Sequence, residues 1–192
     1  MLTYLTQAFS GPAGLFMYLL LAVAAFAVGV TVDRLVQVVK FRVDSDAAVK
    51  RAAEKQPMGS TPLEDVLAAG MAQPDYGRAW DAMTAESIRA EQRIRRRIPY
   101  LATVASLATM IGLFGTVYGL ILAFGTVGEL AAAERAAKLS EGSSTAMAAT
   151  AFGLLVAIPA LAAHSALDAW ARDQLAEIER AANRLALLLP RG

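Results

Sequence analysis

The stretch MIGLFGTVYGLILAFGT, residues 110–126, is apolar enough to lie in lipid, yet it contains four glycines and two threonines. Each glycine costs about 1 kcal/mol relative to alanine within a helix. Gly112, Gly115 and Gly119 fall close to one helical face, and small residues with this spacing let two membrane helices approach closely. The stretch therefore predicts a membrane helix that packs tightly against a neighbour.

The composition of the chain also indicates a membrane protein. Of its 192 residues 56% are hydrophobic, and the mean hydropathy is +0.45. The net charge of +1 gives no field that would attract nucleic acid. The chain has no cysteine and a single histidine, His164, and it contains no nucleotide-binding loop, catalytic triad or metal-ligand spacing. We therefore expect neither enzymatic activity nor a metal or cofactor.

Three windows are long and apolar enough to cross a bilayer, which takes about 20 residues. We expect spans at residues 14–32, 99–127 and 142–167. The predicted fold is an all-α integral membrane protein whose second and third spans extend into the cytoplasm as long helices. Residues 1–32 contain no Lys or Arg, so we expect the first span to be a retained anchor rather than a cleaved signal peptide.

The distribution of basic residues predicts the orientation. Of the 18 Lys and Arg residues, 12 lie in residues 33–98, four in residues 168–192 and two in residues 128–141. Because basic residues concentrate on the cytoplasmic side, we expect a periplasmic N-terminal segment (1–13) and loop (128–141). The segment 33–98 and the C-terminal helix 168–192 would then be cytoplasmic, in a multi-pass inner-membrane protein.

A basic run, RAEQRIRRR at residues 89–97, stands directly before the second span. It is typical of a topology determinant beside anionic lipid headgroups, and the alternative is a specific site for a lipid or a partner. The arginines in question are Arg93, Arg95, Arg96 and Arg97.

The rest of the polar portion predicts helices. Prolines and glycines break residues 57–77 into short helices and turns. A longer helix follows from about Trp80, and Pro99 predicts either a kink or a fresh helix start. Its expected apolar face comprises Met83, Ile88, Ile94 and Ile98, and an apolar seam after the third span comprises Trp170, Leu175, Ile178, Ala182 and Leu185.

The second and third spans contain no Asp, Glu, Lys or Arg, so this chain supplies no carboxylate for a proton relay in mid-membrane. His164 stands near the cytoplasmic end of the third span, where we expect it at the interface rather than in a relay. A second small face comprises Ala146, Ala149, Thr150 and Gly153, and Pro159 frees one backbone carbonyl. Thr116 and Thr150 have two interpretations. Each hydroxyl bonds to a carbonyl one turn earlier, or both face an aqueous or protein-filled pore.

The segments IGLFGTVYGLILAF (111–124) and ATAFGLLVAIPALAAHSAL (149–167) resemble two motifs of the MotA/TolQ/ExbB proton-channel family. These are G-L-L-G-T-V-x-G in the second span and A-T-A-x-G-L-x-x-A-I-P-A in the third. The three-span layout looks closer to ExbB and TolQ than to MotA. The resemblance implies a homopentamer around a pore that holds a dimeric, single-span partner of the ExbD/TolR type. That partner carries the proton-binding Asp, and Thr116 and Thr150 are the pore threonines.

One position departs from the family pattern. Thr145 stands where ExbB-type members often have Glu, within GSSTAMAAT at residues 142–150. We count Thr145 as a candidate pore residue, with Glu141 as a substitute acid one turn upstream.

The resemblance implies a stator-like subunit that converts the proton motive force into mechanical work on the cell envelope, in transport, envelope maintenance or gliding motility. A TonB/TolA-like or gliding-machinery protein would be a further partner. The alternatives are a non-conducting scaffold, assembled through the same small-residue faces, and a Na⁺-coupled member of the family.

Overall fold

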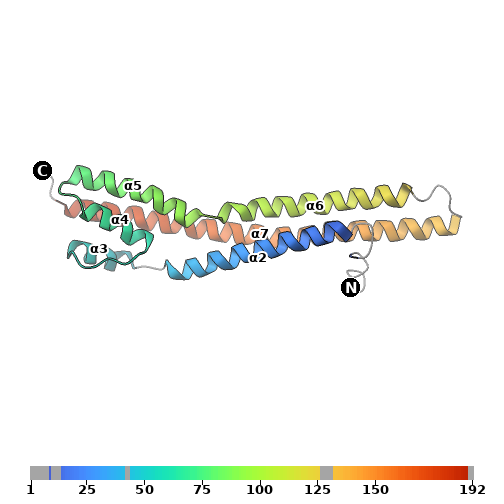
Figure 1. The fold of residues 1–192 in the computed structure, drawn as a ribbon, viewed down its shortest axis with the longest axis horizontal. Coiled ribbons are helices and arrows are strands. Elements are labelled where there is room, and N and C mark those ends of the chain that lie inside the picture. The colour runs from blue at the N-terminus through green and yellow to red at the C-terminus, as the bar shows by residue number, and fades with distance from the viewer. Residues whose placement is uncertain (1–8, 10–13, 42–43, 126–131, 190–192) are drawn as a thin grey trace. The chain divides into compact units, whose positions relative to one another are not determined.

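The computed structural model describes residue 9 and residues 14–41, 44–125 and 132–189, and from Gly14 onward these form six helices (Figure 1). No strand occurs among the described residues. The predicted all-α class is therefore confirmed. The helices are α2 (Gly14–Lys40), α3 (Ser45–Ala53), α4 (Pro62–Met71), α5 (Tyr76–Arg95), α6 (Ile98–Gly125) and α7 (Ala132–Leu188).

Three helical segments are long and apolar enough to cross a membrane, as the sequence predicts: Gly14–Lys40, Tyr76–Gly125 and Glu134–Leu188. The helices run further than the expected spans. α2 continues past residue 32, and α7 begins at Ala132, so most of the expected loop 128–141 is helical. Residues 132–141 are rich in Ala, Glu and Lys, which favour helix even where charge interrupts a span. Residues 126–131, and residues 1–13 apart from residue 9, lie outside the described residues.

The chain divides into two compact units. One, which we call the span unit, comprises Met1–Val32 and Tyr100–His164, and the other, the polar unit, comprises Asp33–Pro99 and Ser165–Gly192. Of the 35 charged residues only five belong to the span unit. The division therefore follows the cost of removing charge from water.

Side-chain caps start the short helices of the polar unit. Asp44 accepts hydrogen bonds from the backbone N–H groups of Asp46 and Ala47, at 3.0 and 3.3 Å. Thr61 and Glu64 form a capping box around Pro62, the first residue of α4. The Thr61 cap explains how α4 begins within the Pro- and Gly-rich segment 57–77.

The apolar face of α5 differs from the expected one. Met83, Ile94 and Ile98 are buried as expected, but Ile88 is 56% exposed, and Ala79 and Ala90 are buried. At 100° per residue, Ile88 lies opposite Ala79, on the solvent side. The face has small residues because α4 packs closely here, and a Cβ atom on Gly70 would lie 2.7 Å from the Cγ of Met83.

The seam of α7 in the polar unit is partly as expected. Ile178, Ala182 and Leu185 are buried, whereas Trp170 and Leu175 are only half-buried.

The junction before α6 is a fresh helix start. α5 ends at Arg95, Arg97 has a left-handed backbone with φ of 68°, and α6 begins at Ile98. Pro99 then occupies the first turn of α6, where its missing N–H costs no helical hydrogen bond.

A buried acid holds α3 and α4 of the polar unit together. Glu64 is 4% exposed and lies 2.9 Å from the guanidinium of Arg51, and Thr61 Oγ1 donates to it at 2.8 Å. Burial raises the pKa of Glu64. The hydrogen bonds from the Thr61 side chain and from the backbone of Gly59 and Thr61, with the charge of Arg51, outweigh burial and hold the pKa below its usual value.

The lowered pKa predicts a pH-dependent polar unit. The carboxylate of Glu64 contributes its full stabilisation above the unfolded-state pKa of about 4.3, and the contribution is lost as the pH falls through the lower, folded-state pKa. Glu64→Gln should remove much of this dependence and cost about 1–3 kcal/mol at neutral pH. Hydrogen exchange of α3 and α4, corrected for intrinsic rates, measures both effects. Glu54→Gln, at a side chain that is 46% exposed, is the control. A Glu64→Gln protein with wild-type pH dependence would contradict the assignment.

Candidate pore-lining site

The backbones of α6 and α7 touch within the span unit. A Cβ atom on Gly153 would lie 2.7 Å from the carbonyl oxygen of Ala108 and 3.0 Å from the Cα of Gly112. A Cβ atom on Gly112 would lie 3.0 Å from the carbonyl oxygen of Ala149. A side chain at either glycine would separate the helices, so both positions require glycine.

The remaining predicted packing glycines extend this contact. A Cβ atom on Gly115 would lie 2.9 Å from the Cβ of Ala149, and one on Gly119 would lie 3.1 Å from the Cβ of Ala146. Sequence reasoning missed Gly142, where a Cβ atom would collide with Ala123. The small-residue pattern of GSSTAMAAT could have indicated it.

The helix α2 packs against the same pair (Figure 1). The ring of Phe16 makes edge-to-face contacts with Phe114 and Tyr118 on α6, each with a centroid separation of 5.4 Å. Met17 is fully buried with Ala149 of α7. α2 thus packs against the side of α6 that contains Phe114 and Tyr118.

Two hydroxyls bridge α6 and α7 where the backbones are closest. Thr116 Oγ1 lies 3.1 Å from the carbonyl oxygen of Ala146 on α7, and Thr150 Oγ1 lies 3.1 Å from that of Gly112 on α6. The two hydroxyls also hydrogen-bond to each other. Thr116 keeps a longer contact, 3.3 Å, to the carbonyl oxygen of Gly112 one turn earlier. The local bond expected from sequence is therefore present, but the bonds across the helix contact accompany it.

The hydroxyl pair is part-buried in an apolar surface. Leu113, Met147 and Leu154, each about one turn from a member of the pair, are 59%, 67% and 43% exposed. Thr145 differs from the pair, because its Oγ1 donates to the carbonyl of Glu141 in its own helix at 2.9 Å. α7 runs through Pro159 without a break.

The arginines before the second span make ion pairs within the polar unit. Arg93 pairs with Asp65 at 2.6 Å, Arg95 with Asp168 at 3.0 Å and Arg97 with Asp33 at 3.2 Å. Each such pair is partly exposed, so water screens it and its contribution to stability is small. Arg96 is exposed, as Arg93 and Arg97 also are.

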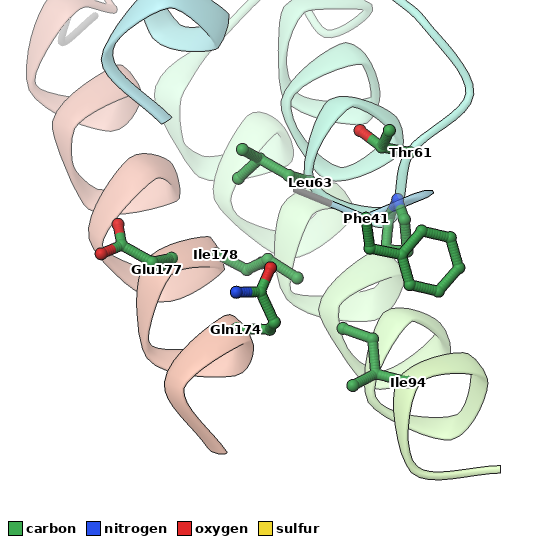
Figure 2. Close-up of a pocket in the computed structure, with 8 residues that line it drawn as sticks. Phe41, Thr61, Leu63, Ile94, Gln174, Glu177 and Ile178 are labelled. Carbon is green, nitrogen blue, oxygen red and sulfur yellow. The ribbon is translucent and has the colours of Figure 1, made fainter. Parts of the chain in front are cut away.

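A small cavity of the polar unit lies between α4, α5 and α7. Figure 2 shows Phe41, Leu63 and Ile94 on one side of it and residues of α7, such as Gln174 and Ile178, on the other. Its free volume of about 10 Å³ is room for about one water molecule. The described residues contain no cluster of His, Cys, Asp or Glu that could hold a metal.

Comparison with known proteins gives the glycine and threonine motifs their context. The model of the MotA/TolQ/ExbB proton channel family matches residues 58–180, which is more than half of the chain. The chain belongs to this family. The match includes α4, α5, α6 and most of α7, so it contains both threonines of the pair.

Relatives within the MotA/TolQ/ExbB family include TolQ and ExbB proteins. The chain is 42% identical over 89 residues to the Tol-Pal system protein TolQ of Haemophilus influenzae, covering 45% of this chain and 38% of that protein. It is 37% identical over 89 residues to the biopolymer transport protein ExbB of Aquifex aeolicus, covering 46% of this chain and 60% of that protein. The matched part thus spans less than two thirds of either relative.

The close contact between α6 and α7 at Gly112 and Gly153 predicts that a larger side chain there destabilises the helix pair. Gly153→Ala should push α6 and α7 apart and destabilise the span unit by about 1–3 kcal/mol, the usual cost of overpacking. Thermal unfolding in detergent, followed by circular dichroism, measures the loss. Gly29→Ala in α2 is the matched control, because a Cβ atom there meets nothing within 4 Å. Equal stability of the two variants would contradict the contact.

Proposed function

We propose that this chain is a proton-channel subunit of an inner-membrane motor that converts the proton motive force into mechanical work on the cell envelope. The hydroxyl pair Thr116–Thr150 is the observation that carries the proposal. It provides polar oxygen atoms in a pair of apolar spans that contain no Asp, Glu, Lys or Arg. A proton path through these spans needs polar groups from this chain and an acid from another.

The acid would come from a partner. An ExbD/TolR-type protein with one span would supply the proton-binding Asp, held in the centre of a ring of copies of this chain, a homopentamer by resemblance. The apolar surface around Thr116 and Thr150 is suited to contact with another helix, since its side chains are exposed in the single chain. A TonB/TolA-like or gliding-machinery protein would receive the work, in keeping with relatives named for the Tol-Pal system and for biopolymer transport.

The proposal assigns a side of the membrane to each part. The polar unit, with most of the basic residues, would be cytoplasmic, and the N-terminus and the start of α7 would be periplasmic. Arg96 would lie at the level of anionic lipid headgroups, where its exposed guanidinium can meet a phosphate.

Thr150→Val tests the proton path. Valine keeps the size and branching of threonine but removes the hydroxyl, so proton flux into liposomes that contain this chain and its partner should fall about tenfold or more. Thr109→Val is the matched control, because Thr109 is a part-buried threonine of α6 whose hydroxyl donates to its own helix at Ala105. Gel filtration of the complex checks that both variants assemble.

The same assay separates the alternatives. Wild-type protein that binds the partner but conducts no ion would make the chain a non-conducting scaffold. Flux that requires Na⁺ at fixed pH would make it a Na⁺-coupled subunit. Full proton flux in Thr150→Val would remove the hydroxyl pair from the path.

The chain has no cysteine, so single cysteines can report its orientation. Glu134→Cys, at an exposed position near the start of α7, should react with a membrane-impermeant maleimide in intact cells. Lys50→Cys, at a side chain in α3 that is 77% exposed, should react only after lysis. The opposite pattern would reverse the proposed topology.

A further inference from the structure

Two arginines share one acid in the part of the polar unit that adjoins the apolar spans in sequence. Asp33 follows directly on the apolar residues 14–32, and Arg97 directly precedes the uncharged residues 98–128. The Oδ2 atom of Asp33 accepts hydrogen bonds from Arg34 at 2.8 and 3.1 Å and from Arg97 at 3.2 Å. We call Asp33, Arg34 and Arg97 the arginine cluster. With two guanidinium groups and one carboxylate, it has an excess of positive charge.

Arg34 is buried without a full set of acceptors. It is 3% exposed, and it is one of two charged residues that are buried in the described part of the chain, the other being Glu64. A guanidinium has five N–H groups, and here Nε and Nη2 each donate one to Asp33. The other three have no hydrogen-bonded acceptor among the described residues. A buried cation that shares its acid with a second cation is unfavourable unless another anion is present.

The backbone of Arg97 has a conformation that arginine seldom adopts. Its φ of 68° lies in the left-handed region, where a Cβ atom causes strain and glycine is not strained. The chain turns at this residue between α5 and α6, and the side chain reaches Asp33 while it stays 45% exposed. Arg97 therefore forms the accessible side of the cluster, and Arg34 forms the buried side.

The donors of the cluster suit a phosphate group. Guanidinium groups bind phosphate oxygens through pairs of parallel N–H bonds. After the bonds to Asp33, Arg34 retains three N–H groups and Arg97 retains four. The cluster contains the first charge after one apolar stretch and the last charge before another. Anionic lipid headgroups lie at this level, where apolar spans meet water.

We infer that Arg34 and Arg97 form a site for the phosphate group of an anionic phospholipid, and that Asp33 orients the two guanidinium groups. An anionic lipid balances the excess charge of the cluster, whereas a zwitterionic lipid has a cation of its own beside the phosphate. The site differs from a general attraction of the basic run 89–97 to a membrane surface, because Arg34 is buried and lies outside that run. It does not depend on proton conduction.

Native mass spectrometry of the purified full-length chain with added dioleoylphosphatidylglycerol measures lipid binding directly. Arg97→Gly removes a guanidinium at a backbone position that suits glycine, so it should keep the fold and weaken binding about tenfold, the loss expected for one charge-assisted contact. Arg34→Gln should weaken binding at least as much. Arg93→Gln is the matched control, because it removes one positive charge from the same basic run but pairs with Asp65 outside the cluster.

Lipid chemistry separates the possible sources of the phosphate. Dioleoylphosphatidylcholine has the same phosphate and acyl chains, and its binding should be weaker and respond little to the two cluster variants. Inorganic phosphate should raise the unfolding temperature of the protein in phosphatidylcholine nanodiscs less than phosphatidylglycerol does. An equal rise that Arg97→Gly abolishes would assign the site to free phosphate and overturn the lipid.

Two other results would also overturn the inference. Equal binding of phosphatidylglycerol by the wild type and Arg97→Gly would remove the cluster from lipid recognition. A changed oligomeric state in Arg34→Gln with unchanged lipid binding would assign Arg34 to an acid of another copy of the chain. Circular dichroism shows whether each variant is folded, and if Arg34→Gln unfolds, Arg97→Gly decides alone because glycine relieves the strain at that residue.

Discussion

The backbone contact between α6 and α7 is the constraint on which the rest of the site depends. Packed helices normally have axes about 8–10 Å apart, with side chains between their backbones. Here Gly112 and Gly153 contribute no side chain, and a Cβ atom on either would lie 3.0–3.1 Å from the Cα of the other. Only at this separation can Thr116 reach the carbonyl of Ala146, and Thr150 that of Gly112. The hydrogen bonds of the threonines therefore depend on the glycines. Gly112 has two roles: it has no side chain at the helix contact, and its carbonyl oxygen accepts a hydrogen bond from Thr150.

The charged residues lie almost entirely outside the unit that contains this contact. An ion in an apolar span costs several kcal/mol unless it is paired, and all but five of the charged residues belong to the polar unit. There they connect helices: Arg51 with Glu64 joins α3 to α4, and Arg93 with Asp65 joins α5 to α4. The span unit is instead held by small residues, by aromatic contacts of Phe16 and by neutral hydrogen bonds. Such a unit can present acceptors to a neighbouring helix without burying a charge of its own.

The sequence was sufficient for features that depend on local spacing. The helical class and the apolar spans follow from composition and periodicity, and the glycine face follows from the spacing of Gly112, Gly115 and Gly119. Features that depend on the distance between helices could not be predicted from the sequence. Whether Thr116 bonds locally or across to α7 is set by the helix separation, and the acid that pairs with Arg95 is 73 residues away in the chain. Ile88 was misplaced because side-chain size suggested a buried position, whereas Ala79 and Ala90 complete the buried face with Met83 and Ile94.

The departure from the family pattern at Thr145 leaves a neutral hydroxyl group in the third span. Its hydroxyl donates to the carbonyl of Glu141, and the carboxylate of Glu141 is 58% exposed and 3.4 Å from Lys138. The acid that follows the start of α7 is thus solvated and paired with a cation one turn away. An exposed pair of this kind is worth at most about 1 kcal/mol, so it adds little to the stability of the spans. Where ExbB-type members often place an acid within the third span, this chain has a neutral hydroxyl. A proton that enters the proposed path would therefore first meet an acid of this chain outside the spans.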